Sequence, residues 1–145
     1  MTTGAWILLA SLVLVVVFAL WRAYADGRFR GTHAVTGADS PVAPTVEPLL
    51  GQDQLGDRAT LLQFSSAFCA PCRATRRVLA DIAAVVPGVV HVEIDAEHHL
   101  DLVRRVGVLR TPTTLVLDGR GHEVTRAAGA PRKEQVLSVL AGIEA

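Results

Sequence analysis

The first stretch of the chain is apolar on every side. Residues 5–21 contain no charged side chain, and Ser11 is their one obvious polar interruption. As a helix they would extend about 25 Å, and the flanking Gly4 and a snorkelling Arg22 bring the segment close to the ~30 Å hydrocarbon core of a bilayer. Because a helix at the surface of a soluble core has a polar face, the pattern predicts a transmembrane helix within residues 1–25.

Two features bear on whether this helix is retained. Trp6 and Trp21 bracket the apolar run, as aromatic residues do at membrane interfaces. Ala23-Tyr24-Ala25 has the small-x-small form of a signal cleavage site, but no Lys or Arg precedes the run and Arg22 separates the run from that site. We expect a retained anchor, with a cleaved signal peptide as the alternative.

The pattern of apolar positions changes after residue 25. Residues 26–48 have few periodic apolar positions and are punctuated by Gly27, Gly31, Gly37, Pro41, Pro44 and Pro48. Such a composition is typical of a flexible linker, which would hold the following domain off the membrane. Residues 49–145 are then long enough to form one small core.

Strand and helix patterns alternate in residues 49–145. Strand patterns occur at residues 60–66, 89–94, 113–117 and 123–127. Helical spacing of apolar residues occurs at 73–86, 98–106 and 131–143. Pro87-Gly88 ends the first helix, and Asp118-Gly119 marks a tight turn between the last two strands. The order βαβαββα predicts a three-layer α/β domain in which helices cover a sheet.

Both cysteines of the chain lie in one short motif, Cys69-Ala70-Pro71-Cys72. The motif stands between a predicted strand and a predicted helix, which places Cys69 at a helix N-terminus. Unpaired N–H groups and the helix dipole favour the thiolate there, and the thiolate is the form that attacks a disulfide. The spacing therefore predicts a redox-active dithiol.

Other uses of the cysteine pair fit the sequence less well. A zinc site needs two further ligands, and no H-x3-5-H spacing occurs among His33, His91, His98, His99 and His122. Arg73 occupies the position where c-type haem attachment requires His. A purely structural disulfide across so short a loop would return little chain entropy. We expect no metal, and no cofactor beyond the dithiol itself.

Three separated places in the chain resemble the thioredoxin family. The segment Phe68-Cys69-Ala70-Pro71-Cys72-Arg73 is similar to the family's aromatic-Cys-x-Pro-Cys-basic signature. Thr111-Pro112-Thr113 resembles its cis-proline loop, and Gly129 falls where the family has a glycine in a substrate-facing loop. The resemblance covers residues 50–143. It implies a thioredoxin-like fold and thiol-disulfide oxidoreductase activity.

The resemblance also implies a role for each residue of the motif. Cys69 would be the exposed nucleophile, and Cys72, one turn further in, the resolving thiol that releases the partner. Pro71, following Ala70, stiffens the turn and removes a backbone donor, while Arg73 brings positive charge near the dithiol. We interpret the neighbouring arginines, Arg76 and Arg77, as a solvated helix face.

Four residues are expected to face the substrate. Thr111, ahead of a cis Pro112, would offer its backbone N–H and C=O to an extended peptide beside Cys69. Phe68 and Gly129 complete this predicted substrate-binding surface. The alternative for Pro112 is an ordinary trans proline at the start of an edge strand.

The sequence departs from the family pattern on the inner side of the dithiol. The family carries a buried acid six residues before the nucleophile, where this chain has Gln63, and His91 takes the place of the basic residue paired with that acid. Ser65 and Phe68 stand where the family has tryptophans. Losing both charges together avoids a lone buried charge. The proton of Cys72 then needs another route, and we interpret His91 as a packed surface histidine.

Charge indicates the compartment. Fourteen basic and fourteen acidic residues make the chain neutral, which gives no indication of nucleic-acid binding. No basic residue precedes the apolar segment, whereas Arg22, Arg28 and Arg30 follow it. The positive-inside rule therefore predicts a cytoplasmic catalytic domain.

Three functions are open at this point. The first is a membrane-tethered protein-disulfide reductase, whose partners are protein disulfide substrates, a thiol-based electron donor and the membrane. The second is an extracytoplasmic thiol oxidoreductase in cytochrome or secreted-protein maturation, distinguished from the first by its compartment. The third is a tethered interaction module with an incidental dithiol, which a fully active double cysteine variant would favour.

Overall fold

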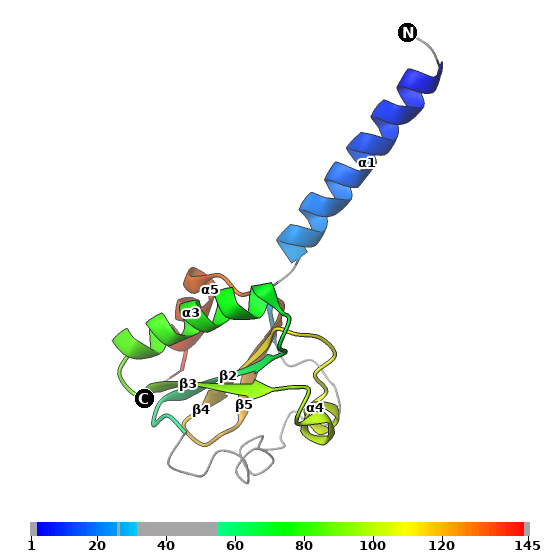
Figure 1. The fold of residues 1–145 in the computed structure, drawn as a ribbon. Coiled ribbons are helices and arrows are strands. Elements are labelled where there is room, and N and C mark those ends of the chain that lie inside the picture. Colours follow the sequence, from blue (N-terminus) through cyan, green and yellow to red (C-terminus); the bar gives the residue numbers. More distant parts are fainter. Residues whose placement is uncertain (1–2, 26, 32–54, 144–145) are drawn as a thin grey trace.

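The computed structural model describes residues 3–25, 27–31 and 55–143. One long helix, α1 (Thr3–Ala25), projects from a compact α/β domain (Figure 1). The strands of the domain are β1 (Phe29–Gly31), β2 (Ala59–Ser65), β3 (Val89–Asp95), β4 (Thr113–Asp118) and β5 (Glu123–Ala128). Its helices are α3 (Ala70–Val85), α4 (Leu100–Val106) and α5 (Lys133–Ala141). From β2 to α5 the predicted order βαβαββα is confirmed.

The strands form one mixed sheet in the order β1-β5-β4-β2-β3. Among the described strands, β2 and β3 run parallel, and the other neighbouring pairs are antiparallel. The β4–β5 pair is the predicted hairpin. Strand β2 lies in the interior of the sheet, between β4 and β3. The cysteine motif follows the carboxyl end of β2, at the start of α3.

Two apolar cores fill the two faces of the sheet, with helices outside both, as a three-layer domain requires. Leu62 and Phe64 of β2 pack with Leu102 of α4 on one face. Leu61, on the opposite face, packs with residues of α3 and α5, including Leu79. Because successive side chains of a strand point to opposite faces, all seven residues of β2 are buried. This burial on both faces explains why Leu61 and Leu62 are adjacent apolar residues, without the alternation expected of a half-exposed strand.

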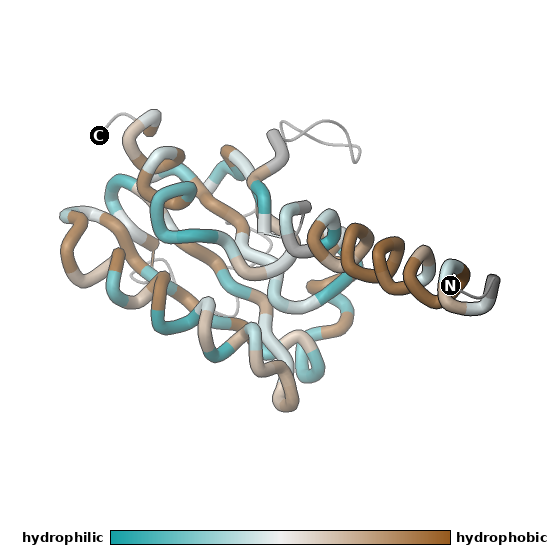
Figure 2. Tube along the Cα trace, turned by 90° about the horizontal axis from the view of Figure 1, so that it is seen from above, coloured by the Kyte–Doolittle hydropathy of each residue, from teal (hydrophilic) through white to brown (hydrophobic). Residues whose placement is uncertain are grey.

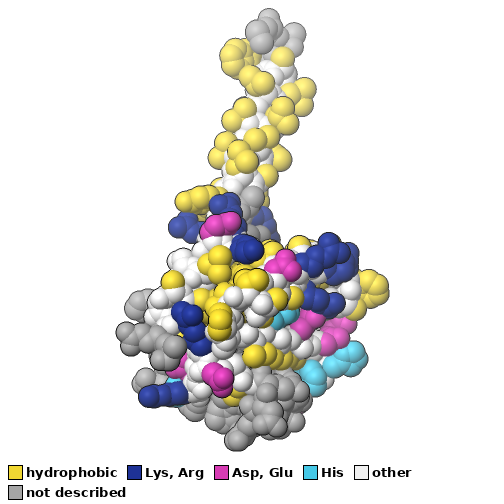
Figure 3. All heavy atoms as spheres, turned by 90° about the vertical axis from the view of Figure 1, so that its left-hand side faces the viewer, with side chains coloured by type: hydrophobic (Ala, Val, Ile, Leu, Met, Phe, Trp, Pro, Cys, Tyr) yellow, Lys and Arg dark blue, Asp and Glu magenta, His cyan; other side chains and the backbone are white. Residues whose placement is uncertain are grey.

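Helix α1 differs from the domain in how its apolar side chains are placed. The hydrophobic colour runs along most of its length in Figure 2, and hydrophobic side chains project along its visible face in Figure 3. Residues Gly4–Arg22 have a mean hydropathy of 2.5, and none of them is buried in the structure. By length and composition this helix is apolar enough to cross a membrane.

The structure differs from the linker prediction at residues 29–31. These residues form β1, which pairs with β5 through the partners Phe29↔Ala127 and Gly31↔Thr125. Phe29 also packs against the core between the sheet and α3 with α5. A three-residue strand is too short to show alternation, and the glycines around it, Gly27 and Gly31, are typical of a loop. Residues 32–48 of the predicted linker lie outside the described residues.

Candidate active site

The two cysteines lie at the start of α3 and form a disulfide in this structure. Cys69 is the N-cap of α3, with an extended backbone, and its Sγ accepts a hydrogen bond from the Cys72 N–H at 3.1 Å. This contact satisfies one of the unpaired donors of the first helical turn. Pro71 fits the same turn because its missing N–H would have no helical partner there.

The two sulfur-bearing residues differ sharply in access. Cys72 is 2% exposed, whereas Cys69 is partly exposed. Phe68, immediately before Cys69, is 99% exposed, and the adjacent Ala70 and Arg73 are also exposed. A large partner can therefore approach the disulfide from the Cys69 side alone.

The cis-proline loop lies against the cysteine motif. The Thr111–Pro112 peptide bond is cis, which confirms the expectation. The hydroxyl groups of Thr111 and Ser66 lie 3.0 Å apart, and the Ser66 carbonyl accepts from the Cys69 N–H at 3.4 Å. These contacts join two segments that are more than 40 residues apart in sequence.

Gly129 completes the outer side of the site, which is the side on which Phe68, Cys69 and the cis-proline loop lie. Its N–H donates to the Pro112 carbonyl at 2.7 Å, and its φ of 101° lies in the region that favours glycine. The side chain of Arg110 holds the neighbouring Ala128 carbonyl at 2.6 Å. The three landmarks of the family resemblance are therefore brought together at one end of the sheet.

Sequence reasoning missed Leu109 on this outer side. Leu109 lies two residues before Thr111 and is 96% exposed. An apolar residue in a connection, beyond the helical periodicity of α4, is the signal that could have identified it. With Phe68 it gives the outer side two fully solvent-accessible apolar side chains.

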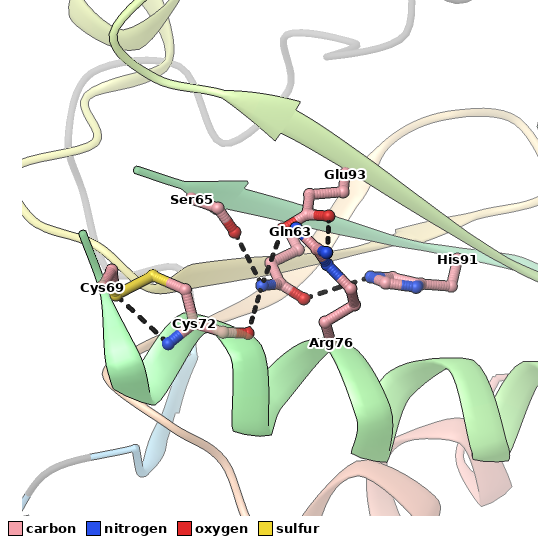
Figure 4. A network of polar contacts seen from close by, with 7 residues as sticks. All are labelled: Gln63, Ser65, Cys69, Cys72, Arg76, His91 and Glu93. Atoms are coloured by element: carbon pink, nitrogen blue, oxygen red, sulfur yellow. Dashed lines mark hydrogen bonds and ion pairs between the residues drawn. A yellow bond between two sulfur atoms is a disulfide. The ribbon is translucent and has the colours of Figure 1, made fainter. Parts of the chain in front are cut away.

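A buried amide organises the inner side (Figure 4). The Gln63 side chain is completely buried in β2. Its Nε2 donates to Ser65 Oγ at 2.7 Å and to the Cys72 carbonyl at 3.0 Å, and lies 3.5 Å from Glu93 Oε1. Its Oε1 lies 3.1 Å from His91 Nε2. Because an amide oxygen only accepts, this geometry places the ring proton of neutral His91 on Nε2.

His91 is therefore more than a packed surface histidine. It lies on β3, next to β2, and is half-buried against Gln63. Burial lowers the pKa of His91 because the charged ring would lose hydration; Glu93 opposes this effect, and Arg76 adds to it. Replacing the family's acid by an amide leaves a hydrogen bond that a neutral histidine satisfies.

Glu93 is the second residue that sequence reasoning missed. It pairs in register with Gln63, and its carboxylate forms an ion pair with Arg76 of α3. Burial works to raise the pKa of Glu93, but hydrogen bonds from Arg76 and Ser65 outweigh burial and lower it. Arg76 is over half exposed, yet this pairing corrects its interpretation as only a solvated residue. His91 and Glu93 are two residues apart in a predicted strand and so lie on the same face of it. This spacing is the sequence signal that could have identified Glu93.

Among the described residues, no group of three or more His, Cys, Asp or Glu side chains is arranged to hold a metal ion. What the site holds instead is one pair of sulfur atoms with an open outer side and a hydrogen-bonded inner side. This arrangement can form and break an S–S bond with a partner.

Known proteins share the fold and the sequence pattern. The chain is 30% identical over 77 residues to thioredoxin H-type 1 of Nicotiana tabacum, a match that covers 53% of this chain and 60% of that protein. It is 28% identical over 104 residues to thioredoxin H2-2 of rice, covering 68% and 77% of the two chains. The structure of a thioredoxin from Nicotiana alata superposes with a TM-score of 0.58 at 23% identity, covering 71% and 88%.

The family model for thioredoxin matches residues 52–142, which contain the disulfide, the cis-proline loop and Gly129. With this match across most of the domain, the chain belongs to the thioredoxin family, as a thiol-disulfide oxidoreductase with a Cys-x-x-Cys pair.

Proposed function

We propose that the protein is a membrane-tethered protein-disulfide reductase in which Cys69 is the nucleophile and Cys72 the resolving thiol. The difference in access between the two cysteines carries this assignment. In the dithiol form, the N-terminus of α3 favours the thiolate of Cys69, where a partner can reach it.

The reaction has two exchange steps. The Cys69 thiolate attacks one sulfur of a substrate disulfide, whose S–S bond breaks; the other substrate sulfur leaves as a thiolate, and a mixed disulfide forms. The Cys72 thiolate then attacks Cys69 Sγ and expels the second substrate thiolate. The substrate gains two electrons, the protein ends in its Cys69–Cys72 disulfide form, and a thiol-based electron donor restores the dithiol.

The outer side is the proposed substrate-binding surface. Thr111 and Pro112 offer the backbone of the cis-proline loop, and Gly129 holds that loop through its bond to the Pro112 carbonyl. An extended peptide can pair with such a backbone as an added strand. Phe68 supplies apolar contact area beside Cys69, and Arg73 positive charge.

The tether is α1, and we assign the catalytic domain to the cytoplasm. The apolar length of α1 supports the membrane span. The basic residues Arg22, Arg28 and Arg30 lie at the end of the span and just after it, which supports the cytoplasmic side.

Trapping experiments on the full chain in membrane vesicles test the chemistry. Cys69→Ser should abolish reduction of a model protein disulfide, whereas Cys72→Ser should still attack and accumulate the mixed disulfide. A non-reducing gel resolves that species. Wild-type rates from Cys69→Ser would refute the reductase assignment.

Labelling with a membrane-impermeant maleimide in intact cells tests the compartment. Labelling of Cys69 only after lysis, without added reductant, is the result expected for a reduced cytoplasmic domain. Labelling of intact cells would place the domain outside, and a requirement for reductant there would favour maturation chemistry in place of protein-disulfide reduction.

A further inference from the structure

The connection between α1 and the sheet is very short. Helix α1 ends at Ala25 and β1 begins at Phe29, so three residues join them. With consecutive Cα atoms 3.8 Å apart, this connection holds the start of β1 within about 15 Å of the end of the helix. The domain is thus tied to α1 through β1, a paired strand of its own sheet.

The pairing of β1 fixes which end of the domain lies next to α1. Phe29 pairs with Ala127, and the Gly27 N–H donates to the Ala128 carbonyl at 3.0 Å. A Cβ at Gly27 would collide with the Ala130 carbonyl, so the chain packs closely here and only glycine fits. Helix α1 therefore meets the domain at the loop that follows β5.

That loop belongs to the active site. Gly129, next to Ala128, bonds the Pro112 carbonyl, and Thr111 bonds Ser66 ahead of the cysteine motif. A short series of contacts therefore leads from the end of α1 to the disulfide. In Figure 1, α1 leaves the domain at the end where α3 begins, away from the β4–β5 turn.

The surface around this junction suits a membrane interface. Trp21 and Tyr24 lie on the last turns of α1, and the Arg28 guanidinium lies over the Tyr24 ring at 4.8 Å. Arg132 and Lys133 are exposed and follow the Ala130–Pro131 segment that contacts Gly27. Basic side chains gather near the base of α1 in Figure 3. Aromatic rings and basic groups are the side chains that bilayer interfaces attract.

From this placement we propose that the substrates are disulfides in membrane-proximal segments of other membrane proteins. The inference rests on the proposed reductase activity and tether. It adds that β1 holds the site at the membrane surface, where the exposed Phe68 and Leu109 meet a neighbouring chain. The electrons move as in the two exchange steps above: the protein dithiol is oxidised and the juxtamembrane disulfide is reduced.

A pair of insertions tests the inference in the full-length chain, reconstituted in vesicles of phosphatidylcholine with a minority of phosphatidylglycerol. Two single-pass model substrates carry the same disulfide, one directly after the span and one beyond a rigid helical spacer of about 30 residues, or about 45 Å. Single-turnover rates are measured from the reduced protein. The wild type should reduce the near disulfide at least about tenfold faster, because its site and that disulfide share one thin layer.

Insertion of about 15 Gly-Ser residues between Ala25 and Asp26 lengthens the tether by about 20 Å and should bring the preference below about twofold. The same insertion between Ser40 and Pro41, after β1, should leave the preference intact. Equal effects of the two insertions, or no preference in the wild type, would overturn the inference.

Two controls separate this inference from the proposed function. Retention of the protein in vesicles after an alkaline carbonate wash reports on the tether, and reduction of a small soluble disulfide reports on the reductase. If either control fails, the proposed function falls and takes this inference with it. If both succeed without a near-disulfide preference, this inference alone is wrong.

Discussion

The outer and inner sides of the disulfide are built in different ways. The outer side consists of connections, with Phe68 and Leu109 exposed and Gly129 bonded to the cis-proline loop. The inner side consists of paired strands, where Gln63 touches the Cys72 carbonyl, His91 and Glu93. Groups on the outer side can exchange their partners for water or a substrate. The fully buried Gln63 amide on the inner side cannot, because burial makes an unpaired polar atom costly.

This difference separates recognition from stability. Changes on the outer side should alter how a substrate binds while leaving folding intact. Changes on the inner side should alter folding and the environment of Cys72, with little effect on the first attack by Cys69. Four predictions test this separation.

The largest loss of stability is expected from Gln63→Leu. Leucine fills the volume but leaves the Cys72 carbonyl, Ser65 and His91 without their shared partner. An unsatisfied buried polar group costs about 1–3 kcal/mol. Because Ser65 keeps its hydrogen bond to Glu93 and the half-buried His91 can reach water, only part of the sum is realised, and we expect a loss of about 2–4 kcal/mol. Urea denaturation measures it. A change below about 1 kcal/mol would show that the inner side is less dependent on this amide than its contacts indicate.

Glu93→Gln should cost less, about 0.5–1 kcal/mol, because its partner Arg76 is over half exposed. We also expect the Glu93 carboxylate to influence Cys72 through Gln63, whose amide contacts both residues. The limb that reports titration of Glu93 should therefore disappear from the pH profile of mixed-disulfide resolution by Cys72. Arg76→Gln is the matched control: it removes a group that lowers the pKa of Glu93, so that limb should move to higher pH. Identical pH profiles in the wild type and both variants would show that Glu93 does not influence Cys72.

Acidification should destabilise the inner side in two stages. The pKa of His91 is lowered on folding from its ordinary value of 6.5. As the pH falls below that value, the unfolded chain binds a proton that the folded chain does not bind, so the free energy of unfolding decreases. The pKa of Glu93 is also lowered, so its contribution is present above 4.5 and is lost below that value. Thermal melts across this range should show both stages. His91→Gln, which keeps a hydrogen-bond donor for Gln63, should remove the first stage. If the first stage persists in this variant, another group is its cause.

Phe68→Ala should have the smallest effect on folding. Its side chain is almost fully exposed, so the free energy of unfolding should change by less than about 0.5 kcal/mol. Reduction of a protein disulfide should nevertheless weaken by about fivefold in kcat/KM, the equivalent of about 1 kcal/mol of contact energy. Reduction of a small soluble disulfide serves as the control and should stay unchanged. An equal loss on both substrates would assign Phe68 to the chemistry in place of recognition.

The sequence by itself determined the local features of the protein. The apolar run of α1, the strand and helix periods of the domain and the placement of Cys69 at a helix N-terminus all depend on residues close together in the chain. The cis state of Pro112 and the position of Gly129 were expected only because short motifs resemble those of a family whose tertiary structure is known.

Only the tertiary structure decided how β1 and the inner side are built. Nothing in residues 29–31 shows that they pair with a strand almost 100 residues later, and this pairing brings the chain that leaves α1 to the loop that follows β5. Likewise, Gln63 meets Glu93 because β2 and β3 pair in one register, and a shift of one residue would turn Glu93 to the other face. Both outcomes depend on contacts between distant segments, whose choice rests on burying apolar faces and satisfying backbone hydrogen bonds over the whole sheet.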